Sequence, residues 1–268
     1  MFGSNRTRYQ SESFSKHRAG KSTSKKNRSF RDSASTKKVE KLAQEASPKS
    51  AQTSPTVGSA IITLCIGHEQ RLFAAHEDVL CHSPFFQTAC RDQFFQSTSK
   101  RIDLPDEEPE IFSSILEYLY KGDYYPRLEF DKRRNTWHLE DAANGRGTAE
   151  STIFHSAVNG SILKDTVIYC AAEKYGLEEL KRLALRKQGL QSGIQCSTIL
   201  SSARYAYANT PDNDSKLRAH YLALIIRSRH TFKRSGTMQN EMENGGKLFF
   251  DLFVAMVNHM DDVANAAK

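Results

Sequence analysis

The sequence predicts an α/β fold: a small, mostly antiparallel sheet flanked by helices, followed by a C-terminal helical extension. Two short apolar segments joined by a glycine turn come first, and helical apolar spacing dominates from Ser161 to about Met260. The first 56 residues lack the aliphatic side chains of a folded segment. We therefore expect a disordered basic, Ser-rich tail (1–56), a domain (57–190) with an insertion at about 123–160, and a helical extension (191–268).

The strands of the sheet are predicted by short apolar runs. The run at 61–66 ends at Gly67, and the run at 71–75 follows within hairpin distance. At 101–104 apolar and charged residues alternate, which is typical of a half-buried strand, and Pro105 ends it. We therefore expect a hairpin and a third strand.

Two helices are predicted around the third strand. Ser83 and Pro84 suit the N-cap and the first position of one helix, where proline's missing N–H costs nothing. Pro109 begins a longer helix, and Gly122 suits its C-terminal end. The apolar residues of this second helix recur at helical spacing: Ile111, Phe112, Ile115, Leu116 and Leu119.

The insertion at 123–160 is long for a connection inside a compact domain. We expect order near Tyr124–Trp137 and mobility around Asn144–Thr148. Its aromatic residues either dock on the domain or form a partner site.

Helical spacing resumes at Ser161 and gives several amphipathic segments, with GTMQNEMENGG (236–246) interpreted as a loose loop. We interpret the apolar stripe of the last segment as core rather than as a cofactor site. Its members are Leu248, Phe249, Leu252, Phe253, Met256, Val257 and Met260.

The positive charge of the chain belongs to the tail. Residues 1–56 contain 13 Lys and Arg against 4 Asp and Glu, a net charge of +9, whereas the remainder carries 25 against 27. The tail is either a solvated segment or a functional one. In the second case Lys25, Lys26 and Arg28 are a candidate nuclear localisation signal, or a loose nucleic-acid or anionic-membrane contact.

Five cysteines without a C-x-x-C pair indicate free thiols in a reducing compartment. The N-terminus lacks the apolar core of a signal peptide, and no apolar run is long enough to span a bilayer. We expect a soluble intracellular protein, nuclear or cytoplasmic, without membrane partners.

Catalytic and metal-binding motifs are absent from the sequence, so we expect no enzyme, no catalytic residue, no metal and no cofactor. His68, His76 and His82 lie close together in sequence, with Cys81 beside His82. We expect His76 to hydrogen-bond the backbone rather than to bind a metal.

Several of these segments together resemble a BTB/POZ domain of the fungal type. The residues that carry the resemblance are Phe73 and His76, the run from Val79 to Phe86, the run from Arg101 to Asp106, Phe112, the run from Tyr118 to Tyr120, and Gly122 with Asp123. Residues 165–185 resemble the helix pair that closes that fold. The resemblance implies a BTB/POZ fold and a protein–protein interaction module without catalysis, of which many dimerise.

The resemblance also implies two partner sites. Cullin-binding members carry an apolar–any–Glu motif, which corresponds to Phe94, Phe95 and Gln96. Gln96 replaces a charge-assisted hydrogen bond by a weaker neutral one, so recruitment of a cullin ubiquitin-ligase scaffold is doubtful.

The second site is the dimer interface. A buried Asp of the dimer centre is missing near residues 59–62, and Glu77 occupies the position of a basic residue. The charged co-repressor pocket is therefore lost, and Ile61, Ile62 and Glu77 remain as the candidate dimer interface.

Two hypotheses for function follow. The first is a BTB scaffold or adaptor with protein partners, a second copy of itself among them. The alternative is a nucleic-acid-associated nuclear protein that binds through its basic tail and is multimerised by the BTB domain.

Overall fold

The computed structural model describes residues 58–94, 101–140 and 151–266, with the side chains of residues 92–94 omitted. Three sets of residues singled out in the sequence lie outside this description. They are the tail (1–56), which includes the localisation signal at Lys25, Lys26 and Arg28, the pair Phe95 and Gln96, and the segment around Asn144–Thr148. The predictions that rest on them stay predictions.

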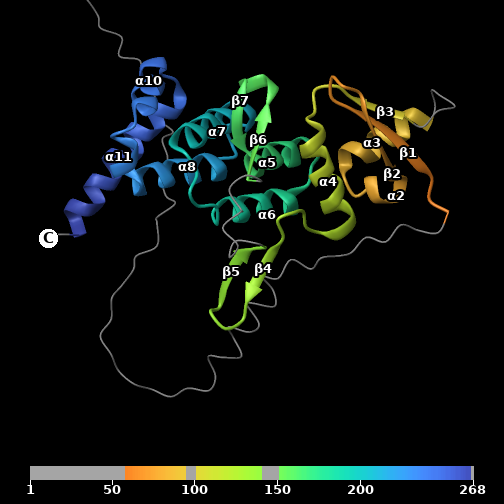
Figure 1. Ribbon diagram of the computed structural model, residues 1–268, viewed down its shortest axis with the longest axis horizontal. Coiled ribbons are helices and arrows are strands. Elements are labelled where there is room, and N and C mark those ends of the chain that lie inside the picture. The colour runs from red at the N-terminus through yellow and green to blue at the C-terminus, as the bar shows by residue number, and fades with distance from the viewer. Residues whose placement is uncertain (1–57, 95–100, 141–150, 267–268) are drawn as a thin grey trace, which may run out of the picture. The chain divides into compact units, whose positions relative to one another are not determined.

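A three-stranded sheet in the order β2-β1-β3 begins the described chain (Figure 1). Its strands are β1 (Ile61–Ile66), β2 (Arg71–His76) and β3 (Arg101–Leu104). β1 pairs antiparallel with β2 and parallel with β3. Gly67 at the turn has a φ of 73°, a left-handed conformation that favours glycine. The predicted hairpin and third strand are confirmed.

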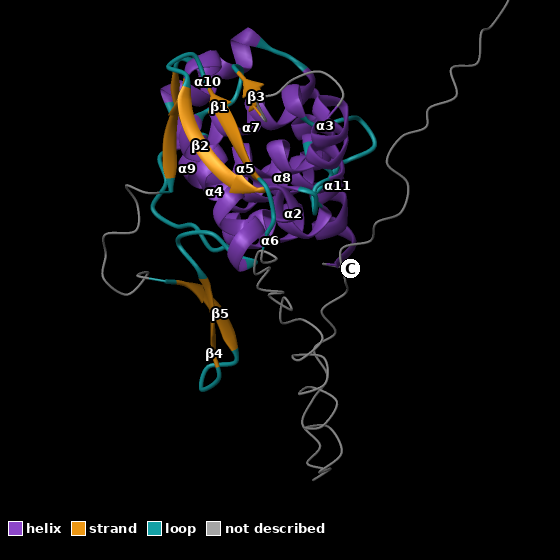
Figure 2. Cartoon of the chain, turned by 90° about the vertical axis from the view of Figure 1, so that its right-hand side faces the viewer, coloured by secondary structure: helices purple, strands orange, loops and turns teal. Residues whose placement is uncertain are grey.

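Helices cover the inner face of this sheet, and Figure 2 shows helices behind and beside the strands. They are α2 (Glu77–Leu80), α3 (Pro84–Phe94) and α4 (Pro109–Lys121). The hydroxyl of Ser83 accepts a hydrogen bond from the amide of Phe86, as expected of an N-cap. Gly122 has a φ of 74° and donates its amide to the carbonyl of Tyr118, so it ends α4 as predicted.

The inner face is apolar except for the exposed Arg71 at the start of β2, and it packs on α4. Ile62, Leu64 and Ile66 of β1 are buried, and the ring of Phe73 on β2 meets the ring of Phe112 edge to face. Leu116, one turn further along α4, is only partly buried, because it lies at the edge of this core.

Two hairpins occupy the region predicted as an insertion, and the sequence interpretation found neither. They are β4 (Leu128–Asp131) with β5 (Thr136–Leu139), and β6 (Thr152–His155) with β7 (Gly160–Leu163). Figures 1 and 2 show the β4–β5 hairpin standing out from the helices. Strand β7 runs to Leu163, so the return of helical structure expected at Ser161 comes later, at Lys164.

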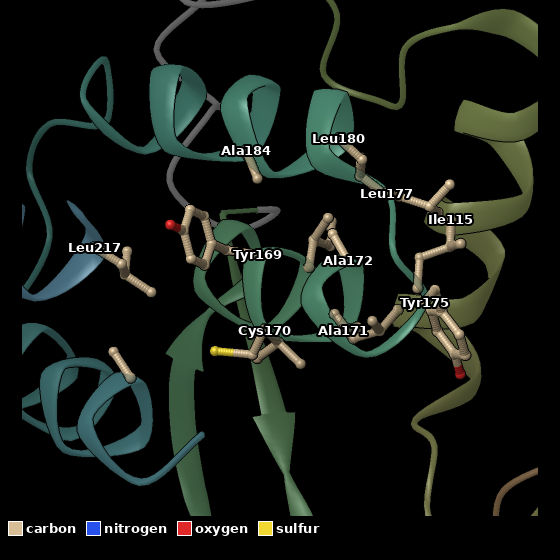
Figure 3. Close-up of a cluster of buried hydrophobic side chains, with 14 of the residues drawn as sticks. Ile115, Tyr169, Cys170, Ala171, Ala172, Tyr175, Leu177, Leu180, Ala184 and Leu217 are labelled. Carbon is tan, nitrogen blue, oxygen red and sulfur yellow. The ribbon is translucent and has the colours of Figure 1, made fainter. Parts of the chain in front are cut away.

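Helices form the rest of the described chain. They are α5 (Lys164–Lys174), α6 (Glu178–Gln188), α7 (Cys196–Asn209), α8 (Lys216–Arg227), α9 (Arg229–Phe232), α10 (Gly236–Asn244) and α11 (Lys247–Ala266). α5 lies between α4, α6 and α7. Figure 3 shows the buried cluster that results, in which Ala172 of α5 and Tyr175, the C-cap of α5, face Leu180 and Ile115. One continuous core thus joins the sheet domain to the helices.

The C-terminal segment differs from the sequence interpretation in two ways. The GTMQNEMENGG segment, interpreted as a loose loop, forms α10 and ends at Gly245. The apolar stripe of α11 is core only in its first turns: Leu248, Phe249 and Leu252 are buried, whereas Phe253 and Met260 are each 66% exposed. Periodicity fixes which residues share a helix face, but it does not show whether anything packs on that face.

None of the five cysteines forms a disulfide, and Cys65, Cys90 and Cys170 are buried. Among the described residues, no helix combines the length and the apolar character needed to cross a bilayer.

Candidate functional site

The outer face of the sheet β2-β1-β3 is the candidate functional site, and we call it the outer sheet face. Strand alternation places every second residue of each strand on it. The register of the three strands defines its members: Ile61, Thr63, Cys65, Leu72, Ala74, His76, Arg101 and Asp103.

Two large apolar residues are exposed on the outer sheet face. Ile61 is 62% exposed and Leu72 is 68% exposed, and Ala74 between them is also exposed. β2 is also an edge strand of the sheet. Exposed apolar residues beside a strand edge are typical of a surface that binds another polypeptide.

The β3 side of the same face is charged. The Arg101 guanidinium lies 2.7 Å from the Asp103 carboxylate (Nε to Oδ1), and both side chains are largely exposed. Hydrogen bonding to Asp103 raises the pKa of Arg101. The outer sheet face is thus apolar on one side and ionic on the other, which gives a partner an orientation.

The predicted dimer-interface residues are separated by the fold. Ile61 is on the outer sheet face, but Ile62 is only 2% exposed and points into the core. Glu77 is half-buried at the start of α2, where its amide donates to the carbonyl of Ala60. Leu72 was not singled out from the sequence, although the strand register would have placed it on the face of Ile61.

The sequence interpretation expected the ring of His76 to hydrogen-bond the backbone, but among the described residues it contacts a side chain instead. Its Nδ1 lies 2.7 Å from the hydroxyl of Tyr120, and its backbone amide donates to the same hydroxyl at 2.9 Å. The sequence could not show this pair because 44 residues separate its members. The contact fixes the end of β2 on α4.

A second notable cluster surrounds Lys187 of α6, whose side chain is fully buried. Its ammonium donates to the carbonyls of Tyr124 and Pro126 and is paired with the Asp123 carboxylate. It also lies 3.6 Å from the centroid of the Tyr124 ring. The Tyr124 hydroxyl in turn donates to Asp165 at 2.7 Å.

Burial shifts the pKa values of this cluster. Desolvation lowers the pKa of Lys187, although the charge of Asp123 opposes the shift. Desolvation raises the pKa of Asp165, against hydrogen bonds from Gln191 and Tyr124. Perturbed groups of this kind also occur in active sites. Here they hold the segment after α4, including its main-chain carbonyls, against α5 and α6, so we assign the cluster a structural role.

The described residues offer no group of three or more His, Cys, Asp or Glu that could hold a metal ion. Burial raises the pKa of Cys170 to about 12, which keeps its thiol protonated and unreactive. Phe94, the first residue of the predicted cullin-type motif, is the last residue of α3, and its side chain is not described. Phe95 and Gln96 lie outside the described residues.

Comparison with known families supports an interaction surface. No protein in a search of curated sequences matches the chain. Residues 61–133 match the family model described as the BTB/POZ domain, so the segment that carries the outer sheet face is similar to a family of protein–protein interaction modules.

Proposed function

We propose that this chain is a non-catalytic scaffold or adaptor that binds a protein partner through the outer sheet face. The observation that carries the proposal is the exposure of Ile61 and Leu72 on one face of the segment that matches the BTB/POZ domain. Each of these residues leaves apolar surface in water that a partner would cover, which favours association.

The test compares the proteins that the full-length chain binds with those bound by the variant Ile61→Asp/Leu72→Asp. Both side chains point to solvent, so the variant should keep the melting temperature of wild type while it loses its partner. The control is Phe154→Asp, which alters an equally exposed residue of β6 away from the sheet, 64% exposed. A partner bound equally by all three proteins would contradict the proposal.

A second copy of the chain is one candidate for that partner, as the predicted dimer interface around Ile61, Ile62 and Glu77 implies. Since Ile62 is buried, a dimer at this face would rest on Ile61 and Leu72 instead. The Ile61→Asp/Leu72→Asp variant then turns a dimer into a monomer in sedimentation experiments.

The basic tail supports the alternative proposal, a nuclear protein that contacts nucleic acid. The tail carries a net charge of +9, whereas the rest of the chain is nearly neutral. Binding through Lys and Arg alone would weaken steeply as salt is raised. The chain from Val57 onward would then lose binding to duplex DNA and keep its protein partner, whereas DNA binding retained by that shorter chain would contradict the tail hypothesis.

A further inference from the structure

α11 carries an exposed apolar stripe, from Phe250 to Val263, that the rest of the described chain leaves uncovered, and we call residues 253–266 its exposed half. Every residue from Met256 to Ala266 is exposed. Figure 1 shows α11 running away from α8 toward the C-terminus. The large apolar residues in the stripe are Phe250 (68% exposed), Phe253 (66%), Met256 (42%), Val257 (40%), Met260 (66%) and Val263 (55%).

A projecting helix of this length is marginal in water without packing. α11 contacts α7 and α8 only through its first turns, where Leu248, Phe249 and Leu252 are buried. The remaining turns therefore need a packing surface to be stable. An exposed stripe of large apolar residues indicates an interaction surface rather than ordinary surface composition.

The spacing of the stripe is that of a coiled coil. Phe249, Phe253, Met256, Met260 and Val263 follow one another at intervals of four, three, four and three residues, as the d and a positions of heptads do. Phe249 is buried against the rest of the protein, and the other four residues are exposed.

We propose that the exposed half of α11 pairs antiparallel with the same helix of a second copy. In this arrangement Phe253 of one copy faces Val263 of the other, and Met256 faces Met260. The two-fold symmetry of the dimer repeats each of these pairs, so the seam has four layers of facing side chains. Each of the two outer layers pairs the large Phe253 with the smaller Val263, as close packing requires.

The seam and the positions beside it carry no Asp, Glu, Lys or Arg that would select a different helix. The acidic residues of the exposed half, Asp261 and Asp262, occupy the b and c positions and point away from the seam, as Asp251 does at f. The flanking e positions are apolar, namely Phe250, Val257 and Ala264. Coiled coils that select a different chain do so through charged e and g residues. Here the e positions are apolar and the g positions hold Leu252, His259 and Ala266.

This dimer is independent of the partner bound by the outer sheet face. It lies at the other end of the described chain, on a helix outside the segment that matches the BTB/POZ domain. The dimer would present two outer sheet faces and so strengthen binding to a partner that has two sites.

The first test measures the oligomeric state of the full chain by sedimentation over a range of protein concentrations. We expect a dimer for wild type. Phe253→Glu/Met260→Glu places carboxylates in the seam and should raise the dissociation constant by about tenfold or more. The matched control Asn258→Glu/Asn265→Glu adds the same charge on the outer f positions and should dimerise like wild type.

The second test reports the orientation of the pair without altering its layers. In the antiparallel register Val257 lies beside Val257 of the other copy, so Val257→Cys should be joined by a short thiol cross-linker. Asn258 is the next residue along the helix but lies on its outer face. Cross-linking of Asn258→Cys should therefore not exceed the background given by the native cysteines.

The proposal would be overturned by a wild type that stays monomeric, by equal dimerisation of the seam and control variants, or by equal cross-linking at positions 257 and 258. A dimer that dissociates only in Ile61→Asp/Leu72→Asp would also overturn it, and would place self-association on the outer sheet face.

Discussion

The rings of Phe73 and Phe112 meet edge to face, with centroids 5.5 Å apart and planes inclined by 70°. Phe73 comes from β2 and Phe112 from α4, so this contact joins the sheet to the helix behind it. Phe86 of α3 touches the same Phe112 ring, with centroids 6.1 Å apart. Phe112 is therefore shared by three elements, and its exposed fraction is 0%.

Replacing Phe112 by Ala should destabilise the protein by about 3–5 kcal/mol, because the change leaves a cavity among three elements that cannot all collapse into it. Denaturant unfolding measures the loss. Phe154→Ala, at a residue 64% exposed, is the control and should cost little. Leu116→Ala should cost less than Phe112→Ala, because Leu116 is only partly buried; equal losses would mean that α4 faces the sheet differently.

Lys187 and its carbonyl partners give the second prediction. Lys187→Met removes the buried ammonium, which leaves the two carbonyls without this donor and the Asp123 carboxylate without its cation. The amides of Tyr124 and Leu128 still donate to Asp123. We expect a loss of about 3 kcal/mol or more, since removing one partner of a buried ion pair is costly. Lys121→Met breaks the exposed pair with Glu117 and should cost at most about 1 kcal/mol.

The fluorescence of Trp137 gives an independent measure for Lys187→Met. Trp137 is the only tryptophan and lies on β5, where its ring packs on Phe130 at 5.0 Å between centroids. The Arg186 guanidinium, next to Lys187 in α6, lies 5.4 Å from the same ring. If Lys187 anchors the segment that leads into this hairpin, the emission of Trp137 shifts in Lys187→Met and stays unchanged in Lys121→Met.

The buried Asp165 gives a dependence on pH. Desolvation raises its pKa, so the folded protein holds this proton more tightly than the unfolded chain does. The stability that Asp165 contributes is therefore greatest below the pKa of an ordinary aspartate. It is lost as pH rises through the raised pKa of the folded state. Asp165→Asn cannot ionise and still accepts from Tyr124, so it should gain stability relative to wild type as pH rises through that window.

Asp131 provides a control of opposite sign. Hydrogen bonds from the backbone amides of Arg134 and Arg133 lower its pKa, so its contribution is lost as pH falls. Thermal unfolding of Asp165→Asn and Asp131→Asn, each compared with wild type from acid to neutral pH, measures the two slopes. Parallel pH profiles for Asp165→Asn and wild type would mean that Asp165 is not desolvated in solution.

The sequence predicted the elements whose signals are local. Gly67, Pro84 and Gly122 mark a turn, a helix start and a helix end through their own backbone restrictions, and the structure places all three there. The β6–β7 hairpin also had a local signal that was missed: Asn159, followed by Gly160, adopts a φ of 50° at its turn.

Tertiary contacts could not be predicted in this way. The burial of Lys187 depends on carbonyls 61 and 63 residues away in sequence, and its position at the end of α6 looked like an ordinary basic helix terminus. The exposure of Phe253 depends on the absence of a packing partner within the described chain, which apolar spacing does not report. For the candidate site, alternation predicted a strand at Ile61, but only the observed register brings Leu72 onto the same face.

The last prediction concerns Gly176, which ends α5 next to the start of α3. Its φ of 69° is strained for any residue with a Cβ, and a Cβ placed there would lie 3.2 Å from the ring of Pro84. The neighbouring Tyr175 carbonyl accepts a hydrogen bond from Ser83 at 2.7 Å, so α3 cannot simply move away.

Gly176→Ala should therefore cost more than the roughly 1–2 kcal/mol of a left-handed alanine alone, because the contact with Pro84 adds to the backbone strain. Gly236→Ala is the matched control: it begins α10, has no atom within 4 Å of the added methyl group, and has no left-handed φ. It should leave stability unchanged or raise it by up to about 1 kcal/mol, because alanine restricts the unfolded chain.

Denaturant unfolding of the two variants separates these outcomes. If Gly176→Ala does not change stability, the Pro84 ring must lie further than 3.2 Å from the added methyl group. If the double variant Pro84→Ala/Gly176→Ala recovers part of the loss, that part comes from the steric contact with Pro84.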